Sequence, residues 1–264
     1  MSKKLEGKIY YYKDELNDSF TEPLKNSKVI DENYKYVHKN IFYRFASFIL
    51  YRFVALPISY LYLKCKFHLS YKNKKAIKKF RNKGIFIYGN HTQQFLDPFS
   101  PAHLTFPTKP YIIAHPDNVS LKVIGKCMPM LGAIPLPSNI KATKNFIYCI
   151  NYLNKKGKPI MIYPEAKIWP YYTKIRPFIS SSFNYPVKTN SPVFAMTTTY
   201  QKRKNPKKVK VTIYVDGPFY PDENLTNNKD KEQNLRDKVY NQMVERTKNN
   251  NVEFIKYKKI NENN

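Results

Sequence analysis

Cysteine, glycine and acidic residues are all scarce in this chain. Its 264 residues include 3 Cys and 7 Gly, and 19 Asp and Glu stand against 46 Lys and Arg, giving a net charge of +27. Cys65, Cys127 and Cys149 are too few and too scattered for a disulfide framework or a zinc site. We therefore expect no metal site, and we expect the three cysteines to be buried apolar fillers in a reducing compartment.

The shortage of acidic residues favours anionic partners, either a phospholipid surface or nucleic acid. A high content of Asn and Lys with little Gly is also typical of an AT-rich coding bias, which explains part of the excess. Binding of nucleic acid would need a recognised reading module, and the sequence contains none, so we expect no nucleic-acid partner. The basic stretch 202–208 is explained most simply as a solvated hairpin connection, with membrane contact as the functional alternative.

A long uninterrupted apolar run is missing as well. Residues 41–63 are dense in Phe, Tyr, Leu and Ile, but Arg44 and Arg52 interrupt them, and the charge-free run 53–63 contains Pro57. About 20 apolar residues are needed to span a bilayer. We therefore expect an interfacial helix, or a helical pair bent at Pro57, with the arginines extending to the lipid headgroups. Packing on the rest of the protein as a core helix is the alternative.

The length and the apolar content predict one domain with a small appendage. With 264 residues, of which 42% are apolar, the chain can bury a substantial core. Residues 1–8 lack the apolar core of a secretory signal. We therefore expect a peripheral or monotopic protein on the cytoplasmic face of the cell membrane.

Strand-like and helix-like segments alternate through the middle of the chain. The strands are expected at 84–89, 109–114, 159–163, 191–199 and 208–216. The helices are expected at 98–105, 118–129, 141–156 and 230–248. This alternation predicts an α/β fold, a mixed but mainly parallel sheet flanked by helices, with the N-terminal membrane-associating helical element before it. We expect the polar tail 257–264 to be frayed.

One short segment carries most of the chemical information. Asn90 and His91 follow the apolar run 84–88, and Asp97 comes six residues after His91. Ligands of open α/β sheets bind past the carboxyl ends of the strands, so the imidazole and the carboxylate are expected at such a site. A histidine oriented by a carboxylate can take a proton from a hydroxyl. The structural alternative is that Asp97 caps a helix beginning at Pro98.

A second histidine pattern offers a comparison. His115-Pro116-Asp117 also follows a strand-like run, 111–114, but it lacks matching flanks, and we interpret His115 as a loop histidine.

Four segments, in order, resemble the conserved blocks of the glycerolipid acyltransferases typified by lysophosphatidate acyltransferase. They are Asn90-His91 with Asp97, then Leu131-Gly132-Ala133-Ile134-Pro135-Leu136-Pro137, then Tyr163-Pro164-Glu165-Ala166-Lys167-Ile168, and then Ser191-Pro192-Val193-Phe194-Ala195. The resemblance covers roughly residues 80–220. It divides the chain into a polar segment 1–40, an interfacial helical element 41–70, an α/β acyltransferase domain 71–256 and the polar tail 257–264.

The chain also departs from the usual pattern of that superfamily. Five residues instead of four separate His91 from Asp97, so the pair must close through a turn. A Gram-positive subgroup is similar in this spacing and in having aromatic residues and an Arg-Pro after the Pro-Glu, as at Arg176 here. Two usual phosphate-binding arginines are missing, and Lys167 stands near the position of one of them. Acyl transfer survives this loss, but the identity of the acceptor is put in doubt.

The resemblance implies that His91 and Asp97 are catalytic and that Asn90, Glu165, Lys167 and Arg176 bind substrate, Arg176 pairing with phosphate. It implies acyl transfer from a thioester to a lysophospholipid, most directly lysophosphatidate, at the membrane surface, with no bound cofactor. Backbone N–H groups near the third block are expected to stabilise the oxyanion. Acyl-CoA and acyl carrier protein both stay open as donors. Two alternatives stay open, a different lysolipid or glycolipid acceptor, and an inactive scaffold that binds lipid or nucleic acid.

Overall fold

The computed structural model describes residues 7–22, 24, 26–205 and 208–260. Expectations for residues 1–6, 206–207 and 261–264 lie outside this range. The strands are β1 (Lys8–Tyr12), β2 (Ser70–Lys72), β3 (Phe86–Gly89), β4 (Tyr111–Ala114), β5 (Ala133–Pro135), β6 (Ile160–Ile162), β7 (Val193–Gln201), β8 (Lys210–Phe219) and β9 (Ile255–Lys259). The longer helices are α1 (Ile41–Ile49), α2 (Leu56–Phe67), α7 (Ile140–Lys155) and α9 (Asn228–Thr247).

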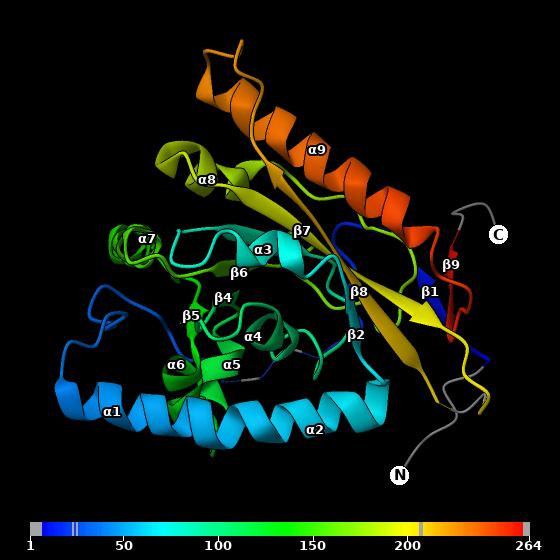
Figure 1. The fold of residues 1–264 in the computed structure, drawn as a ribbon, viewed down its shortest axis with the longest axis horizontal. Helices are drawn as coiled ribbons and strands as arrows, with labels where there is room; N and C mark the ends of the chain where they lie inside the picture. The colour runs from blue at the N-terminus through cyan, green and yellow to red at the C-terminus, as the bar shows by residue number, and fades with distance from the viewer. Residues whose placement is uncertain (1–6, 23, 25, 206–207, 261–264) are drawn as a thin grey trace.

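A seven-stranded sheet in the order β2-β8-β7-β3-β6-β4-β5 forms the centre of the molecule (Figure 1). The strands β7, β3, β6, β4 and β5 are parallel neighbours, and β8 runs antiparallel to β7. This confirms the expected α/β fold with a mainly parallel sheet. The antiparallel β7–β8 pair also places the described part of the basic stretch, residues 202–205 and 208, in a hairpin connection.

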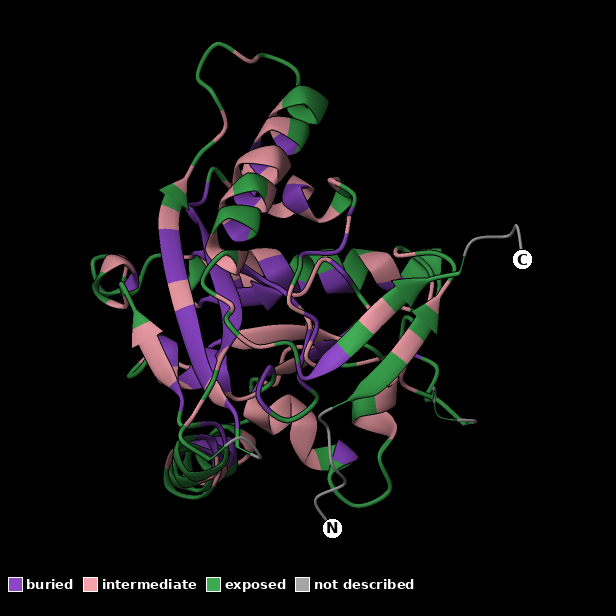
Figure 2. Cartoon of the chain, turned by 90° about the vertical axis from the view of Figure 1, so that its right-hand side faces the viewer, coloured by how far each residue is buried: buried purple, intermediate pink, exposed green. Residues whose placement is uncertain are grey.

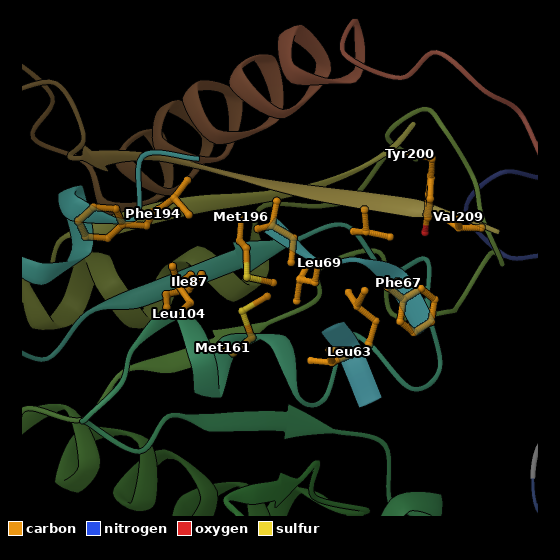
Figure 3. Close-up of a cluster of buried hydrophobic side chains, with 14 of the residues drawn as sticks. Leu63, Phe67, Leu69, Ile87, Leu104, Met161, Phe194, Met196, Tyr200 and Val209 are labelled. Atoms are coloured by element: carbon orange, nitrogen blue, oxygen red, sulfur yellow. The ribbon is translucent and has the colours of Figure 1, made fainter. Parts of the chain in front are cut away.

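Helices cover both faces of the sheet. Successive side chains of a strand point to opposite faces, so each strand contributes to two hydrophobic clusters. In β3, Ile87 joins one hydrophobic cluster, while Phe86 and Tyr88 join the other. The first cluster is closed by Leu63 and Phe67 of α2, beside Met161 and Phe194 of the sheet (Figure 3). The second is closed by α7 and by the fully buried apolar stripe of α9, Leu235, Val239 and Met243.

The segment 41–67 forms one continuous helical run along the lower edge of the molecule (Figure 1). It begins at Asn40, whose side chain caps the N–H groups of Phe42 and Tyr43, and it ends at His68 in a left-handed conformation. The expected bend at Pro57 is absent, because the π-helical turn η1 (Leu50–Ala55) joins α1 to α2 without a break. The run is long and apolar enough to cross a membrane by length and composition, and only 11% of its apolar window is buried.

The expected helix 118–129 is divided into three short pieces. These are α5 (Asp117–Ser120), the 3₁₀ turn η2 (Gly125–Cys127) and α6 (Met128–Leu131). The backbone is extended at Leu121, which ends α5, and Gly125 packs against the backbone of Val119 so closely that a Cβ would lie 2.6 Å from its carbonyl oxygen. The sequence shows an apolar period here but gives no sign of this close approach.

Two expectations for the ends and the cysteines were wrong. Residues 257–259 are not frayed, because they belong to β9, which pairs in parallel with β1 from the other end of the chain. Cys65 is exposed rather than buried, and all three cysteines are free. The sequence analysis also missed β2, β5, α3 (Lys75–Lys78) and α8 (Asn184–Thr189), all of which are three to six residues long.

Candidate active site

The His91–Asp97 pair lies just past the carboxyl end of β3. His91 Nδ1 is 2.8 Å from Asp97 Oδ2, and the same oxygen accepts the backbone N–H groups of Thr92 and Gln93, each at 2.9 Å. Asp97 therefore does not cap a helix, and the next helix, α4 (Ser100–Leu104), begins only at Ser100. The pair closes through a turn, as the five-residue spacing predicts, with the N–H of Asp97 bonded to the carbonyl of Gln93 at 3.1 Å.

The two members of the pair differ in exposure. The Asp97 side chain is fully buried, whereas 18% of the His91 side chain is accessible. Burial raises the pKa of Asp97, and the hydrogen bond and charge of His91 act in the opposite direction. Because Nδ1 faces the carboxylate, Nε2 is the ring nitrogen left to exchange a proton with a ligand.

Tyr163, the residue between β6 and the Pro-Glu, fixes the pair from the side. Its ring stacks on the His91 imidazole with the centroids 4.5 Å apart, and its hydroxyl donates to the backbone carbonyl of Asp97 at 2.6 Å. Gly89 makes room for this arrangement, because a Cβ there would lie 2.9 Å from the Tyr163 ring and 2.4 Å from Met161. The imidazole is thus held on both its edge and its face.

Asn90 is directed into the sheet and away from any ligand. Its side chain is bonded twice to the backbone of Thr198 in β7, accepting from the N–H at 2.8 Å and donating to the carbonyl at 3.1 Å. Only 1% of the residue is exposed. Its contacts locate the end of β3 relative to β7, and the expected contact with substrate stays a prediction.

Glu165 and Arg176 are also occupied by the protein itself. The carboxylate of Glu165 accepts the N–H groups of His91 and Arg176, both at 3.0 Å, and lies 3.7 Å from the Arg176 guanidinium. Both side chains are 1% exposed. Burial raises the pKa of Glu165 and lowers that of Arg176, while the attraction between the two charges opposes both shifts.

The Arg176 guanidinium lies over the Trp169 ring and donates to the carbonyl oxygens of Glu165, Lys167 and Glu15. These contacts enclose the guanidinium, and the expected contact with phosphate stays a prediction. Lys167 is directed to the same N-terminal segment, where its ammonium bonds to the carbonyl of Asn17.

The backbone of the third block is similarly engaged. The N–H groups of Ala166, Lys167 and Trp169 donate to the carbonyls of Tyr163, Glu165 and His91. These three groups are therefore not available to an oxyanion in this arrangement.

A cation that the sequence analysis overlooked lies beside the loop between His91 and Asp97. The ammonium of Lys66 donates to the Tyr62 hydroxyl at 2.7 Å and lies 5.9 Å from the centroid of the Phe95 ring. Phe95 is 55% exposed, and Lys66 is exposed as well. The sequence alone could not predict this position of Lys66, because only the packing of α2 against the loop brings it to the site.

The second histidine–carboxylate pair of the described chain is more open. His115 Nδ1 is 3.3 Å from Asp117 Oδ2, and 63% of the His115 side chain is exposed. The pair follows β4, and none of the surrounding contacts of His91 is repeated there. It provides a natural control for experiments on His91.

Within the described residues, no group of three or more His, Cys, Asp or Glu side chains is placed to hold a metal ion. A partly exposed histidine oriented by a buried carboxylate, at the carboxyl end of a parallel strand, has the chemistry to take a proton from a hydroxyl.

The family described as Acyltransferase matches residues 68–199, half of the chain, and the chain belongs to this family. Its general activity is therefore acyl transfer to a lipid acceptor as an O-acyltransferase. A comparison with curated proteins found no match.

Proposed function

We propose that this protein transfers a fatty acyl group from a thioester to the free hydroxyl of a lysophospholipid, with lysophosphatidate as the first candidate acceptor. The observation that carries the proposal is the 2.8 Å pair of His91 and Asp97, in which the partly exposed imidazole is oriented by a buried carboxylate. The Gram-positive subgroup with the same His-to-Asp spacing is the proposed place of this chain within the superfamily.

In the proposed reaction, Nε2 of His91 removes the proton of the acceptor hydroxyl as its oxygen bonds to the thioester carbonyl carbon. Asp97 holds the tautomer and stabilises the imidazolium that forms. The tetrahedral intermediate then collapses, the C–S bond breaks, and the thiolate takes the proton back from His91. An ester and a free thiol result, without an acyl-enzyme.

The exposed side of the helical run 41–67 supports a membrane position for this reaction. Its exposed large apolar side chains include Ile41, Phe42, Phe45, Phe53, Ile58 and Leu61. The run is seen end-on in Figure 2, where its outward surface is coloured as exposed. It packs along the domain through α6 and α4, which favours a helix lying on the cytoplasmic leaflet over one spanning the bilayer. Phe95, next to Tyr62 of the same run, would bring the His91 loop to the lipid surface.

The engagement of Arg176 and Lys167 inside the protein favours a second candidate acceptor, a lysolipid or glycolipid alcohol without phosphate. Lys66 is the candidate that would restore phosphate recognition. If it does, Lys66→Gln should raise the KM for lysophosphatidate about tenfold and leave the KM for a phosphate-free lysolipid unchanged. Equal activity of the wild type on both acceptors would exclude lysophosphatidate as the preferred acceptor.

The test of the main proposal is labelled acyl transfer to lysophosphatidate in liposomes, from acyl-CoA and from acyl carrier protein. His91→Ala should lower the rate by about 10²–10⁴-fold, the usual contribution of a general base. His115→Ala, which removes the exposed histidine of the comparison pair, should leave it unchanged. Equal activity of His91→Ala and wild type would refute the catalytic role of the pair, and a folded wild type inactive on every lysolipid would favour an inactive scaffold.

A further inference from the structure

A cavity of about 790 Å³ lies between the helical run 41–67 and the α/β domain, away from His91. Its walls are α1 and η1, the segment 34–38 before α1, the loop 107–109, the start of β5 and the face of α7 that carries Tyr152. In Figure 1 these elements lie at the lower left, with α7 above and α1 below. The cavity is therefore formed jointly by the proposed membrane element and the domain.

The charge of the cavity has one sign. Arg44, Arg52, Lys109, Lys156 and Lys158 line it, and no carboxylate is among its lining residues. Within the described part of the chain, none of these five cations forms an ion pair. Convergent cations without a counter-charge repel one another, and a bound anion relieves that repulsion.

Lys109 lies at the inner end of this set. Its ammonium donates to the Ser47 hydroxyl at 3.1 Å and to the carbonyl of Met130, and it lies 5.2 Å and 5.3 Å from the ring centroids of Tyr51 and Tyr111. Burial, with the charge of Lys158, lowers the pKa of Lys109 to about 8. The ammonium of Lys109 thus has hydrogen-bond and aromatic partners but no carboxylate partner among the described residues.

Arg52 carries an unsatisfied donor at the same cavity. One arm of its guanidinium donates to the carbonyl of Pro107 at 3.2 Å, and the group lies over the Phe106 ring at 4.8 Å. Its other terminal nitrogen, Nη1, is buried and has no hydrogen-bond partner. A buried donor without an acceptor is unfavourable, and an anionic oxygen in the cavity can supply the acceptor.

The cavity is not part of the His91 site. Tyr111 of β4 and Phe86 of β3 pair with the same residue, Ile160 of β6, so they lie at the same level of the sheet. β3 runs from Phe86 to Gly89, about 10 Å along the strand direction, and His91 lies beyond its carboxyl end. A short acceptor headgroup bound at His91 cannot reach the cavity at the opposite end of the strands.

We propose that this cavity binds the phosphate of an anionic phospholipid from the membrane on which the helical run lies, as a second lipid site distinct from the acceptor site. The same helix supplies both parts of such a site. Arg44, Ser47 and Arg52 line the cavity, whereas Phe42, Phe45 and Phe53 are 80%, 65% and 63% exposed on the outside. A lipid with its chains beside the exposed face has its headgroup at the level of the cavity. The inference requires the membrane position of the helix but not the acyl-transfer reaction.

The test measures binding of the full-length protein to vesicles without any thioester, so no reaction takes place. Vesicles of phosphatidylcholine alone are compared with vesicles that contain phosphatidylglycerol. The cavity variant is Lys109→Gln with Lys158→Gln, and the matched control is Lys141→Gln with Lys144→Gln, exposed lysines at the far end of α7. Lys156→Gln with Lys158→Gln is a second cavity variant that leaves the inner lysine in place.

Both cavity variants should lose at least about tenfold more affinity for the phosphatidylglycerol vesicles than the control, the loss expected for one charge-assisted hydrogen bond. All variants should bind neutral vesicles alike. Equal losses in cavity and control variants would overturn the proposal, since binding would then follow total charge. Inorganic phosphate, added at constant ionic strength, separates the two sources of phosphate. If the difference in vesicle affinity between cavity and control variants persists with inorganic phosphate present, it supports the lipid headgroup. If inorganic phosphate abolishes this difference, the cavity is assigned to a soluble phosphate compound instead.

Discussion

The substitution Glu165→Gln tests whether the third block contacts the acceptor or only positions His91. The carboxylate accepts one N–H from His91 and one from Arg176, each at 3.0 Å, so both oxygens are used. A glutamine keeps one carbonyl oxygen and presents an NH₂ group to the other N–H. It therefore breaks one buried hydrogen bond and leaves the buried Arg176 guanidinium without its counter-charge.

Removal of one partner from a buried ion pair is unfavourable by about 3–5 kcal/mol. Because domains of this kind are stable by about 5–15 kcal/mol, we expect Glu165→Gln to remove a large share of the stability and still fold at low temperature. Equilibrium unfolding by urea measures this change in the free energy of unfolding. Acyl-transfer kinetics under folding conditions should show a lower kcat, because the N–H of His91 loses its support, with the KM of the acceptor within about twofold.

A buried carboxylate remote from the site serves as the control. Glu232 of α9 is 1% exposed and bonds to Asn184 at 2.7 Å, but its cationic partner Lys229 is 77% exposed and stays hydrated when the charge is removed. Glu232→Gln should therefore lower stability by only about 1–2 kcal/mol and leave kcat unchanged. The positioning role would be refuted if Glu165→Gln were as mild as this control, or if it raised the acceptor KM tenfold with kcat intact.

Three further predictions concern a backbone angle and two titrations. Ala166 is exposed and has a φ of 61°, so Ala166→Gly should raise stability by about 0.5–1 kcal/mol in thermal unfolding, and a lower Tm would contradict this. Burial and the charge of Lys74 lower the pKa of His103 to about 4, so between pH 6.5 and 4 the unfolded chain binds more protons. The free energy of unfolding should therefore fall by up to about 3 kcal/mol as the pH is lowered from 6.5 to 4. In acid titrations followed by circular dichroism, His103→Gln should show a smaller fall than the wild type. Lys109, with a pKa of about 8 in the free protein, should hold its charge below that pH, so binding of phosphatidylglycerol vesicles should weaken as the pH rises above 8. Lys109→Gln should remove this dependence, and a wild type with a flat profile from pH 7 to 9 would contradict it.

The central sheet was predictable from the sequence because its strands are short apolar runs buried on both faces. The expected strands at 84–89, 159–163 and 191–199 coincide with β3, β6 and β7. The pairing of β1 with β9 was not predictable, because Lys8 and Ile255 meet only in the folded chain and both strands are rich in Lys and Tyr. What holds β9 is an aromatic contact, the Tyr257 ring stacked on Trp169 with centroids 5.0 Å apart.

The geometry of the histidine–carboxylate pair was predictable from local sequence, since Asp97 comes only six residues after His91, few enough to close through one turn. The surroundings of Arg176 were not. An arginine near a Pro-Glu motif resembles an anion-binding residue, and only the full fold shows that carbonyl groups from residues 15–18 and the Trp169 ring enclose that region. The local sequence gives the charge of a side chain, but it does not predict which distant segment will cover that side chain in the fold.

The segments that cover Lys167 and Arg176 bear on which residues determine the preference for an acceptor. The family match covers residues 68–199, which include His91, Asp97 and Glu165. Lys167 and one arm of the Arg176 guanidinium bond to carbonyls of residues 15–17, and Lys66, the cation beside the His91 loop, belongs to α2, both outside the match. In the proposed reaction the matched region supplies the His91–Asp97 pair, and the segments before it contribute contacts of Lys167 and Arg176 and the side chain of Lys66. We infer that acceptor preference in this chain depends on residues 15–17 and 41–67, so exchange of these segments should change the acceptor KM more than the kcat of transfer.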